Sequence, residues 1–222
     1  MQHEQAQRAG AVLEVVFGAL PAADTEAIRR LLGWVWSVGF DPATDPFLGT
    51  YLPGLTVELE IASGISVELP LDRDTVGLVL AEAHQRAGDL AAAVDVVEHV
   101  TPSTIAAVSL AELYIAEQRW NDVIDLTNGL ANADDPTMFL LVQRAVALSE
   151  SGSYVAAREV LKEALRVRSR PAALRHAALI TRADTYLAEN KVATARRDLE
   201  KILAEDAAYP GLQDALARLP QS

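Results

Sequence analysis

The side chains in this sequence that could do chemistry are scattered carboxylates and four histidines. Glu58 and Glu60 come closest to a catalytic pair, because two neighbouring carboxylates can divide general acid and general base work. They alternate with Leu59 and Ile61, so on a strand both carboxylates point to one face and both apolar residues to the other. We interpret the pair as a solvated strand face and predict no catalytic residue there.

The histidines lie at His3, His84, His99 and His176, and neither HExxH nor HxxxH occurs. A zinc site on a helix needs such pairs. Cysteine is absent, which removes thiolate metal ligands and a cysteine nucleophile. His84 falls at a packing position, so we interpret it as a core residue. The sequence therefore predicts no metal site.

Motifs for nucleotide binding and for nucleophilic serine are missing as well. GxGxxG and GxxxxGK[ST], which cradle phosphates, do not occur, and neither does GxSxG. We therefore predict a protein that is not an enzyme and has no cofactor. One alternative stays open, an enzyme whose unrecognised site lies in the first 72 residues.

Charge and composition limit the partners. The formal net charge is −12, which repels nucleic acid, so we expect no nucleic-acid partner. No apolar run reaches the roughly 18 to 20 residues that span a bilayer, and no export leader is evident. Because cysteine is absent, a reducing compartment such as the cytosol is the simplest location, and we expect a cytoplasmic protein. We expect no membrane partner.

Fixed residue types recur around four turn positions: Gly88, Gln118, Gly152 and Asn190. The turns are 30, 34 and 38 residues apart. Seven residues before each turn stands an alanine: Ala81, Ala111, Ala145 and Ala183. Five residues after each turn stands a small residue: Ala93, Val123, Ala157 and Ala195. Antiparallel helices approach closely only where small side chains meet, so the pattern predicts four helix pairs.

Residues 74 to 207 resemble four tetratricopeptide repeats, a family with a period of about 34 residues and small and aromatic residues at such positions. Arg144 and Arg182 depart from its pattern, because the family prefers an apolar residue there, and Gln118 and Asn190 replace the usual turn glycine. The whole chain also resembles repeat proteins of unassigned function that are common in actinobacteria. The resemblance implies an α–α superhelix that binds another protein, and it implies no activity.

Apolar periodicity predicts helices over these ranges: 73–87, 89–100, 103–117, 119–131, 137–151, 153–167, 172–189 and 191–205. Leucines after Pro210 predict an end helix that covers the last repeat. The predicted fold is therefore mostly α, with a tetratricopeptide-like solenoid over residues 73–222 made of about four helix pairs and a C-terminal capping helix.

The first 72 residues do not repeat and form a predicted N-terminal cap. We expect helices at 4–20 and 25–38, and a loop rich in Gly and Pro at 39–54. Alternating apolar residues then predict a β-hairpin over 55–70 with one apolar and one acidic face. Because an isolated hairpin is barely stable, its apolar face should rest on the helices before it or on the first repeat.

Aromatic residues crowd the region before this hairpin: Trp34, Trp36, Phe40, Phe47 and Tyr51. They would either seal the N-terminal helices onto the repeats or form an exposed pocket for a partner.

The first helix of each pair lines the concave side of such a solenoid. Three residues before each packing alanine stands the apolar row of a predicted partner-binding groove: Leu78, Val108, Val142 and Ile180. One residue after the alanines stand Glu82, Glu112, Val146 and Asp184. Gln85 and Glu150 extend the groove, which would set apolar residues beside carboxylates.

We expect this groove to bind a basic or amphipathic peptide of another protein, through apolar burial and through its carboxylates. It lacks the Lys, Arg and Asn with which some tetratricopeptide proteins grip a chain-terminal carboxylate. Alternatively, neighbouring repeats cover the apolar row and the carboxylates only keep the surface soluble. A further alternative is a regulatory or sensory domain that acts with a kinase or a transcription factor.

Charge is also distributed unevenly along the chain. Residues 158 to 201 hold eleven Arg or Lys and six Asp or Glu, a local charge of +5, which leaves −17 for the remainder. Either these are ordinary solvated helix faces, or this basic end meets the acidic end of a second copy and gives a homodimer.

Overall fold

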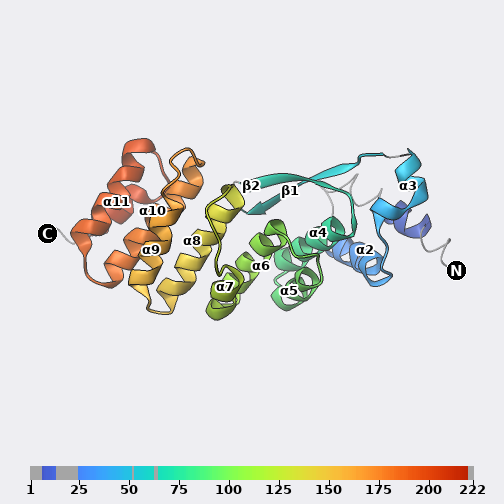
Figure 1. Ribbon diagram of the computed structural model, residues 1–222, viewed down its shortest axis with the longest axis horizontal. Coiled ribbons are helices and arrows are strands. Elements are labelled where there is room, and N and C mark those ends of the chain that lie inside the picture. The colour runs from blue at the N-terminus through green and yellow to red at the C-terminus, as the bar shows by residue number, and fades with distance from the viewer. Residues whose placement is uncertain (1–6, 14–24, 52, 63–64, 220–222) are drawn as a thin grey trace. The chain divides into compact units, whose positions relative to one another are not determined.

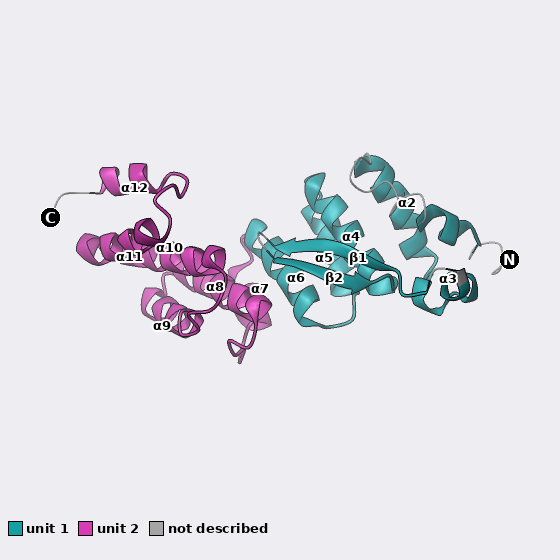
Figure 2. Cartoon of the chain, turned by 90° about the horizontal axis from the view of Figure 1, so that it is seen from above, with its two compact units in different colours: residues 1–117 teal, residues 118–222 magenta. Residues whose placement is uncertain are grey.

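The computed structural model describes residues 7–13, 25–51, 53–62 and 65–219. They are mostly helical, with one antiparallel β-hairpin (Figure 1). The predicted mostly-α, tetratricopeptide-like architecture is confirmed. The chain forms two compact units, residues 1–117 and 118–222 (Figure 2). The limit between them falls at the Gln118 turn, and the cap boundary predicted at residue 72 lies inside the first unit.

The first unit contains the N-terminal elements and the first repeat helices. Residues 7–13 are helical, and the elements that follow are α2 Thr25–Ser37, η2 Pro42–Thr44, α3 Pro46–Tyr51, β1 Thr56–Ala62, β2 Ile65–Pro70, α4 Arg73–Arg86, α5 Leu90–Glu98 and α6 Thr104–Ala116. α2 matches the helix predicted at 25–38. The rest of the helix predicted at 4–20 lies outside the described residues.

The prediction of a loop at 39–54 is wrong in part, because this segment contains η2 and α3. Asp41 and Asp45 each accept hydrogen bonds from amides two or three residues further on. A proline follows each aspartate, at Pro42 and Pro46, where its missing N–H is harmless. An Asp cap followed by Pro is a helix start, and the Gly and Pro content of the segment concealed both starts.

The β-hairpin pairs β1 with β2 from Thr56 opposite Pro70 to Ala62 opposite Ile65. Its apolar side chains Val57, Ile61 and Ile65 are buried, whereas the three glutamates between its apolar positions are exposed. β1 packs on α6. The hairpin therefore rests on the first helix of the second predicted repeat, one helix pair further along the chain than expected.

α2 packs on α4 through a close approach at Gly77. A Cβ atom on Gly77 would lie 2.8 Å from Cζ3 of Trp36 and 2.9 Å from Cγ2 of Val100. The Arg73 guanidinium lies 4.2 Å from the centroid of the Trp36 ring and donates to the Trp36 carbonyl oxygen. Trp36 thus joins the N-terminal helices to the repeats, while Phe47 is 62% exposed.

The second unit contains the later helices: α7 Trp120–Leu126, α8 Asp135–Glu150, α9 Tyr154–Ala164, α10 Ala172–Ala188, α11 Val192–Glu205 and α12 Leu212–Arg218. α7 stops short of the predicted residue 131 because Gly129 adopts a positive φ of 71°. α12 confirms the predicted end helix. Its Leu212 and Leu216 pack on a cluster of α10 and α11 that includes Leu199 and Ile202.

The small residues of the repeat pattern are buried in both units. At most 1% of the surface is exposed at the alanines before the turns: Ala81, Ala111, Ala145 and Ala183. None is exposed at the small residues after the turns: Ala93, Val123, Ala157 and Ala195. The turn residues all adopt positive φ: Gly88 78°, Gln118 58°, Gly152 77° and Asn190 58°. Small side chains and left-handed turns thus occur where the pattern places them.

The two arginines that depart from the family pattern make polar contacts inside the second unit. Arg144 Nη1 donates to the carbonyl oxygen of Ile124, 2.6 Å away at the end of α7. Arg182 forms a two-pronged ion pair with Asp198 of α11, at 2.7 and 2.8 Å. An arginine is tolerated at these packing positions because each head group finds an acceptor on the neighbouring helix.

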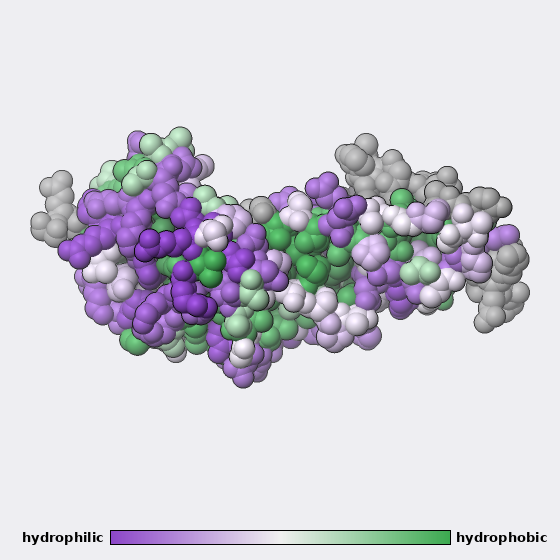
Figure 3. Space-filling model, turned by 45° about the horizontal axis from the view of Figure 1, so that its top comes forward, coloured by the Kyte–Doolittle hydropathy of each residue, from purple (hydrophilic) through white to green (hydrophobic). Residues whose placement is uncertain are grey.

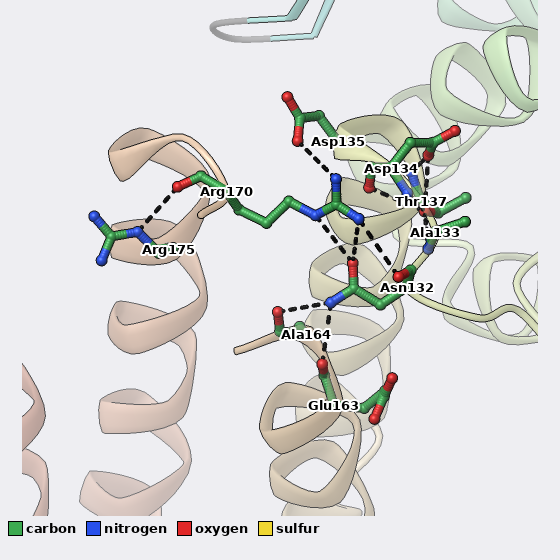
Figure 4. Close-up of polar contacts among 9 residues, drawn as sticks. All are labelled: Asn132, Ala133, Asp134, Asp135, Thr137, Glu163, Ala164, Arg170 and Arg175. Carbon is green, nitrogen blue, oxygen red and sulfur yellow. Dashed lines mark hydrogen bonds and ion pairs between the residues drawn. The ribbon is translucent and has the colours of Figure 1, made fainter. Parts of the chain in front are cut away.

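Buried Asn132 connects the loops of the second unit (Figure 4). Its Nδ2 donates to the carbonyl oxygens of Glu163 and Ala164, at 3.1 and 2.9 Å, and so caps the end of α9. Its Oδ1 accepts from Arg170, which also pairs with Asp135 at 3.2 Å. One side chain therefore links the start of α8, the end of α9 and the loop before α10.

Candidate functional site

The apolar row of the predicted groove is mostly packed inside the protein. Leu78 is 5% exposed, Val108 0% and Val142 5%. Ile180 is partly buried against the α10–α12 cluster that contains Leu212. Three of these four side chains are therefore buried in this conformation, which favours the alternative that the apolar row is covered, and the partner-binding groove stays a prediction.

The positions one residue after the alanines remain accessible. Glu82, Glu112 and Val146 are partly exposed, and Asp184 is exposed. Together with Glu60 and Glu150, these residues make up two carboxylate clusters, one in each unit. Glu60, Glu82 and Glu112 belong to the first unit, and Val146, Glu150 and Asp184 belong to the second.

Three elements bring carboxylates together in the first unit. Glu82 lies on α4, Glu112 on α6 and Glu60 on β1, which packs on α6. Burial, and then the charges of Glu82 and Glu60, raise the pKa of Glu112 from its ordinary 4.5 to about 7. Glu82 is paired with Arg86 at 2.8 Å, but within the described residues no cation pairs with Glu112.

A second pair of carboxylates stands on α8 and α10. Burial, and then the charge of Glu150, raise the pKa of Asp184 above its ordinary 3.8. Part of the Asp184 surface is exposed, yet enough protein surrounds the carboxyl group to disfavour its charged form. Neither side chain has an ion-pair partner in the described part of the unit. An arriving Lys or Arg would therefore meet negative charge that nothing in the unit neutralises.

Sequence reasoning placed Glu60 on a solvated strand face and missed its effect on Glu112. The two residues are far apart in the sequence, and only the packing of the hairpin on α6 brings them close. Alternation along the strand indicates which face a residue occupies. It does not indicate which helix packs near that face. The only sign of this interaction in the sequence is that both segments are acidic.

The basic side chains between residues 158 and 201 are largely engaged within the second unit. Ion pairs join Arg158 to Glu189, Arg175 to Glu205 and Lys201 to Asp198. Figure 3 shows a mostly hydrophilic surface over the α9–α11 side of the visible face, and separately a gathering of hydrophobic residues around the hairpin. The predicted electrostatic homodimer stays a prediction. Few of these basic side chains remain available for ion pairs with a second copy.

In the described part of the chain, no group of three or more His, Asp or Glu side chains is arranged to hold a metal ion. None of the helices described is both long enough and apolar enough to cross a bilayer. The alternative of an enzyme site in the first 72 residues stays a hypothesis, since part of that region lies outside the described residues.

Comparison with known proteins gives a consistent family. Residues 51–219 match the family model described as T7SS, ESX-1 secretion system protein EccA1, N-terminal domain. The crystal structure of the N-terminal domain of EccA1 ATPase from the ESX-1 secretion system of Mycobacterium tuberculosis is similar, with 18% identity, a TM-score of 0.63, and coverage of 97% of this chain and 90% of that one.

A thermophilic tetratricopeptide-repeat protein from Thermus thermophilus is also similar in structure. Its identity is 15% and its TM-score 0.55, with 98% of this chain and 97% of that one covered. Both likenesses support the tetratricopeptide-like fold. No curated protein matches the sequence at a significant level.

Proposed function

Because the chain belongs to the family of EccA1 N-terminal domains of the ESX-1 type VII secretion system, we propose that it is a protein-binding module that serves a secretion system of this kind. The observation that carries the proposal is the pair of carboxylate clusters, one in each unit. Glu112, Glu150 and Asp184 lack a cation partner within the described residues, although carboxylates on crowded protein surfaces are usually paired or fully solvated.

The partner that either carboxylate cluster fits is a basic or amphipathic segment of another protein. Lys and Arg side chains would relieve the repulsion between Glu82 and Glu112 in the first unit and between Glu150 and Asp184 in the second. Partly exposed Val146 offers an apolar contact beside the second pair. Because Leu78, Val108 and Val142 are covered, charge contributes more to recognition than the sequence suggested.

Such binding makes and breaks no covalent bond. The carboxylates would raise the association rate of a basic segment and select against acidic ones, with an affinity that falls as salt is added. Binding would also release protons, because a nearby cation favours the charged forms of Glu112 and Asp184.

The test is capture of partners from an extract of the source cells with immobilised wild-type protein and charge-reversal variants. Glu82→Lys with Glu112→Lys removes the first carboxylate pair, and Glu150→Lys with Asp184→Lys removes the second. Binding of the captured partner should weaken about tenfold or more in at least one of these double variants, by analogy with charge reversal at protein interfaces.

The matched control is Glu200→Lys with Asp214→Lys, which changes the net charge equally at exposed positions on α11 and α12. This variant should keep wild-type affinity. Equal loss in all three double variants would show that only net charge matters. Unchanged affinity in both carboxylate-cluster variants would remove the two clusters from the account.

A further inference from the structure

The β1–β2 hairpin is a two-stranded sheet, and in the described part of the chain no third strand pairs with the outer edge of β2 (Figures 1 and 2). β1 packs on α6, whereas β2 has β1 as its main packing partner. Two strands alone are marginally stable, and an unpaired strand edge presents backbone groups that another extended chain can bond. Whether β2 can accept such a chain depends on which of its backbone groups point outward.

The register of the hairpin fixes the direction of these groups. The Leu71 amide donates to the Leu55 carbonyl oxygen at 2.9 Å, so these two opposite residues form a hydrogen-bonded pair. Hydrogen-bonded and non-bonded pairs alternate along an antiparallel ladder. Counting along the register, Glu68 opposite Glu58 is a non-bonded pair, and Ser66 belongs to the next one. The N–H and C=O groups of Ser66 and Glu68 therefore point away from β1.

The outward groups of Ser66 and Glu68 are available for pairing. Both residues are exposed, and within the described residues these groups make no hydrogen bond. Pro70 is the next outward residue, and its missing N–H is tolerated because that position faces away from β1. Its carbonyl oxygen already accepts from the Thr75 hydroxyl at 2.7 Å, so the free edge ends there. The edge thus offers a donor and an acceptor at both Ser66 and Glu68, which suits a short added strand.

The apolar face of the hairpin is incompletely covered along β2. On β1, Val57 and Ile61 are buried. On β2, Val67 and Leu69 are only partly buried, as is Leu59, which lies opposite Val67. A strand added to β2 would place its own apolar side chains beside these residues and cover them.

The other face of the hairpin determines which charge an added strand should carry. Glu58 and Glu68 lie directly opposite each other in a non-bonded pair, where cross-strand side chains come closest. Both are exposed, and neither has an ion-pair partner in the part of the chain that the structure describes. Glu68 accepts a hydrogen bond from the Thr56 hydroxyl at 2.5 Å, which leaves its charge in place. Because opposed like charges destabilise a sheet, Lys or Arg beside them would be stabilising.

We propose that the outer edge of β2 accepts an extended segment of a partner protein as an antiparallel third strand, in which basic and apolar residues alternate. Ser66 and Glu68 bond the backbone of the segment, and its apolar side chains cover Val67 and Leu69. Its Lys or Arg side chains lie on the face of Glu58 and Glu68, so acidic segments are repelled. Neither Ser66 nor Glu68 belongs to the two carboxylate clusters, and the inference does not rest on the proposed function.

Binding of labelled synthetic octapeptides to the whole chain, followed by fluorescence anisotropy, tests the chemistry of the segment. The first peptide alternates lysine and valine, TKVKVKVT, and should bind. A second has the same composition without the alternation, TKKKVVVT, and a third alternates but is acidic, TEVEVEVT. Both should bind at least about tenfold more weakly. If the first peptide does not bind, or binds no better than the second, the proposal is overturned.

Backbone methylation of the first peptide tests the pairing itself. In an antiparallel pair, opposite residues share a face, so the lysines that face the glutamates are also the residues whose N–H groups bond β2. Methylating the lysine nitrogens should weaken binding about tenfold through the loss of these bonds, whereas methylating the valine nitrogens should change it less than about threefold. The two peptides have equal mass and charge. Equal affinity, or the reverse order, would contradict strand addition.

A matched pair of substitutions in the protein locates the edge. Glu68→Pro and Glu58→Pro each remove one carboxylate and one outward N–H, but from opposite edges of the hairpin. Glu68→Pro should weaken binding of the first peptide about tenfold and Glu58→Pro less than about threefold. Equal losses would show that the charge or the integrity of the hairpin matters rather than the β2 edge, and would overturn the proposal. The capture experiment uses other variants, so failure here would leave the proposed function to that test.

Discussion

At the scale of single residues, the surroundings of the carboxylates shift their pKa values in opposite directions. Glu112 and Asp184 are crowded by protein and by other carboxylates, which raises their pKa. Burial would raise the pKa of Asp198 too, but hydrogen bonds from Arg182 and Lys201 outweigh it and hold that pKa below its ordinary value. Asp198 therefore supports the fold, while Glu112 keeps a charge that the fold does not neutralise.

The raised pKa of Glu112 makes stability depend on pH. Its folded-state pKa of about 7 exceeds the ordinary 4.5, so its contribution is fully present below pH 4.5 and is lost as pH rises through 7. Glu112→Gln should therefore raise the free energy of unfolding at pH 8 by about 1 to 2 kcal/mol, a figure reduced for solvent screening. At pH 4.5 the variant and the wild type should unfold at the same urea concentration, and a difference of equal size at both pH values would contradict the assignment.

For Asp198, the dependence of stability on pH has the opposite sign. Its lowered pKa means that its stabilising contribution is present above the ordinary value of 3.8 and is lost as pH falls through the folded-state value. Asp198→Ala leaves the partly buried Arg182 without its partner and should cost about 3 kcal/mol at pH 7. Glu159→Ala breaks an exposed pair with Lys162 and should cost less than about 0.5 kcal/mol. Denaturant unfolding at pH 7 compares the two, and equal losses would be incompatible with the buried pair.

At the scale of elements, two glycines inside helices differ in what surrounds them. Gly77 of α4 faces Trp36 and Val100, whereas a Cβ on Gly33 of α2 would meet nothing within 4 Å. Gly77→Ala should destabilise by about 1 to 3 kcal/mol through overpacking, although alanine favours helix. Gly33→Ala should stabilise by about 0.5 to 1 kcal/mol through helix propensity alone. Thermal unfolding of the two variants should shift in opposite directions, and a stabilised Gly77→Ala would refute the close approach.

The turns offer a second comparison at this scale. Gln118 adopts φ of 58°, a left-handed conformation that costs a residue with a Cβ about 1 kcal/mol. Gln118→Gly should recover most of that, and Asn190→Gly should gain less, because asparagine tolerates this conformation better. Chemical denaturation would measure both gains, and a loss at Gln118 would mean that its side chain contributes more than the strain removes.

At the scale of the whole molecule, the helix pairs could be predicted and the surface could not. The alanines and turns repeat locally, so the burial of the alanines and the positions of the turns followed from spacing. The hairpin packs on α6, which follows it in the sequence after α4 and α5, and no local pattern specifies that contact. The helix starts in η2 and α3 were visible as Asp-Pro pairs but were outweighed by Gly and Pro content.

Site-specific photo-crosslinking in living source cells tests the central claim, that partners bind at the carboxylate clusters, most directly. A photoreactive amino acid in place of Asp184 should give one discrete adduct with a protein that carries a basic segment. The same group in place of Val155, which is 66% exposed at the start of α9, should give none. An adduct from Val155 alone, or from both positions equally, would contradict the account.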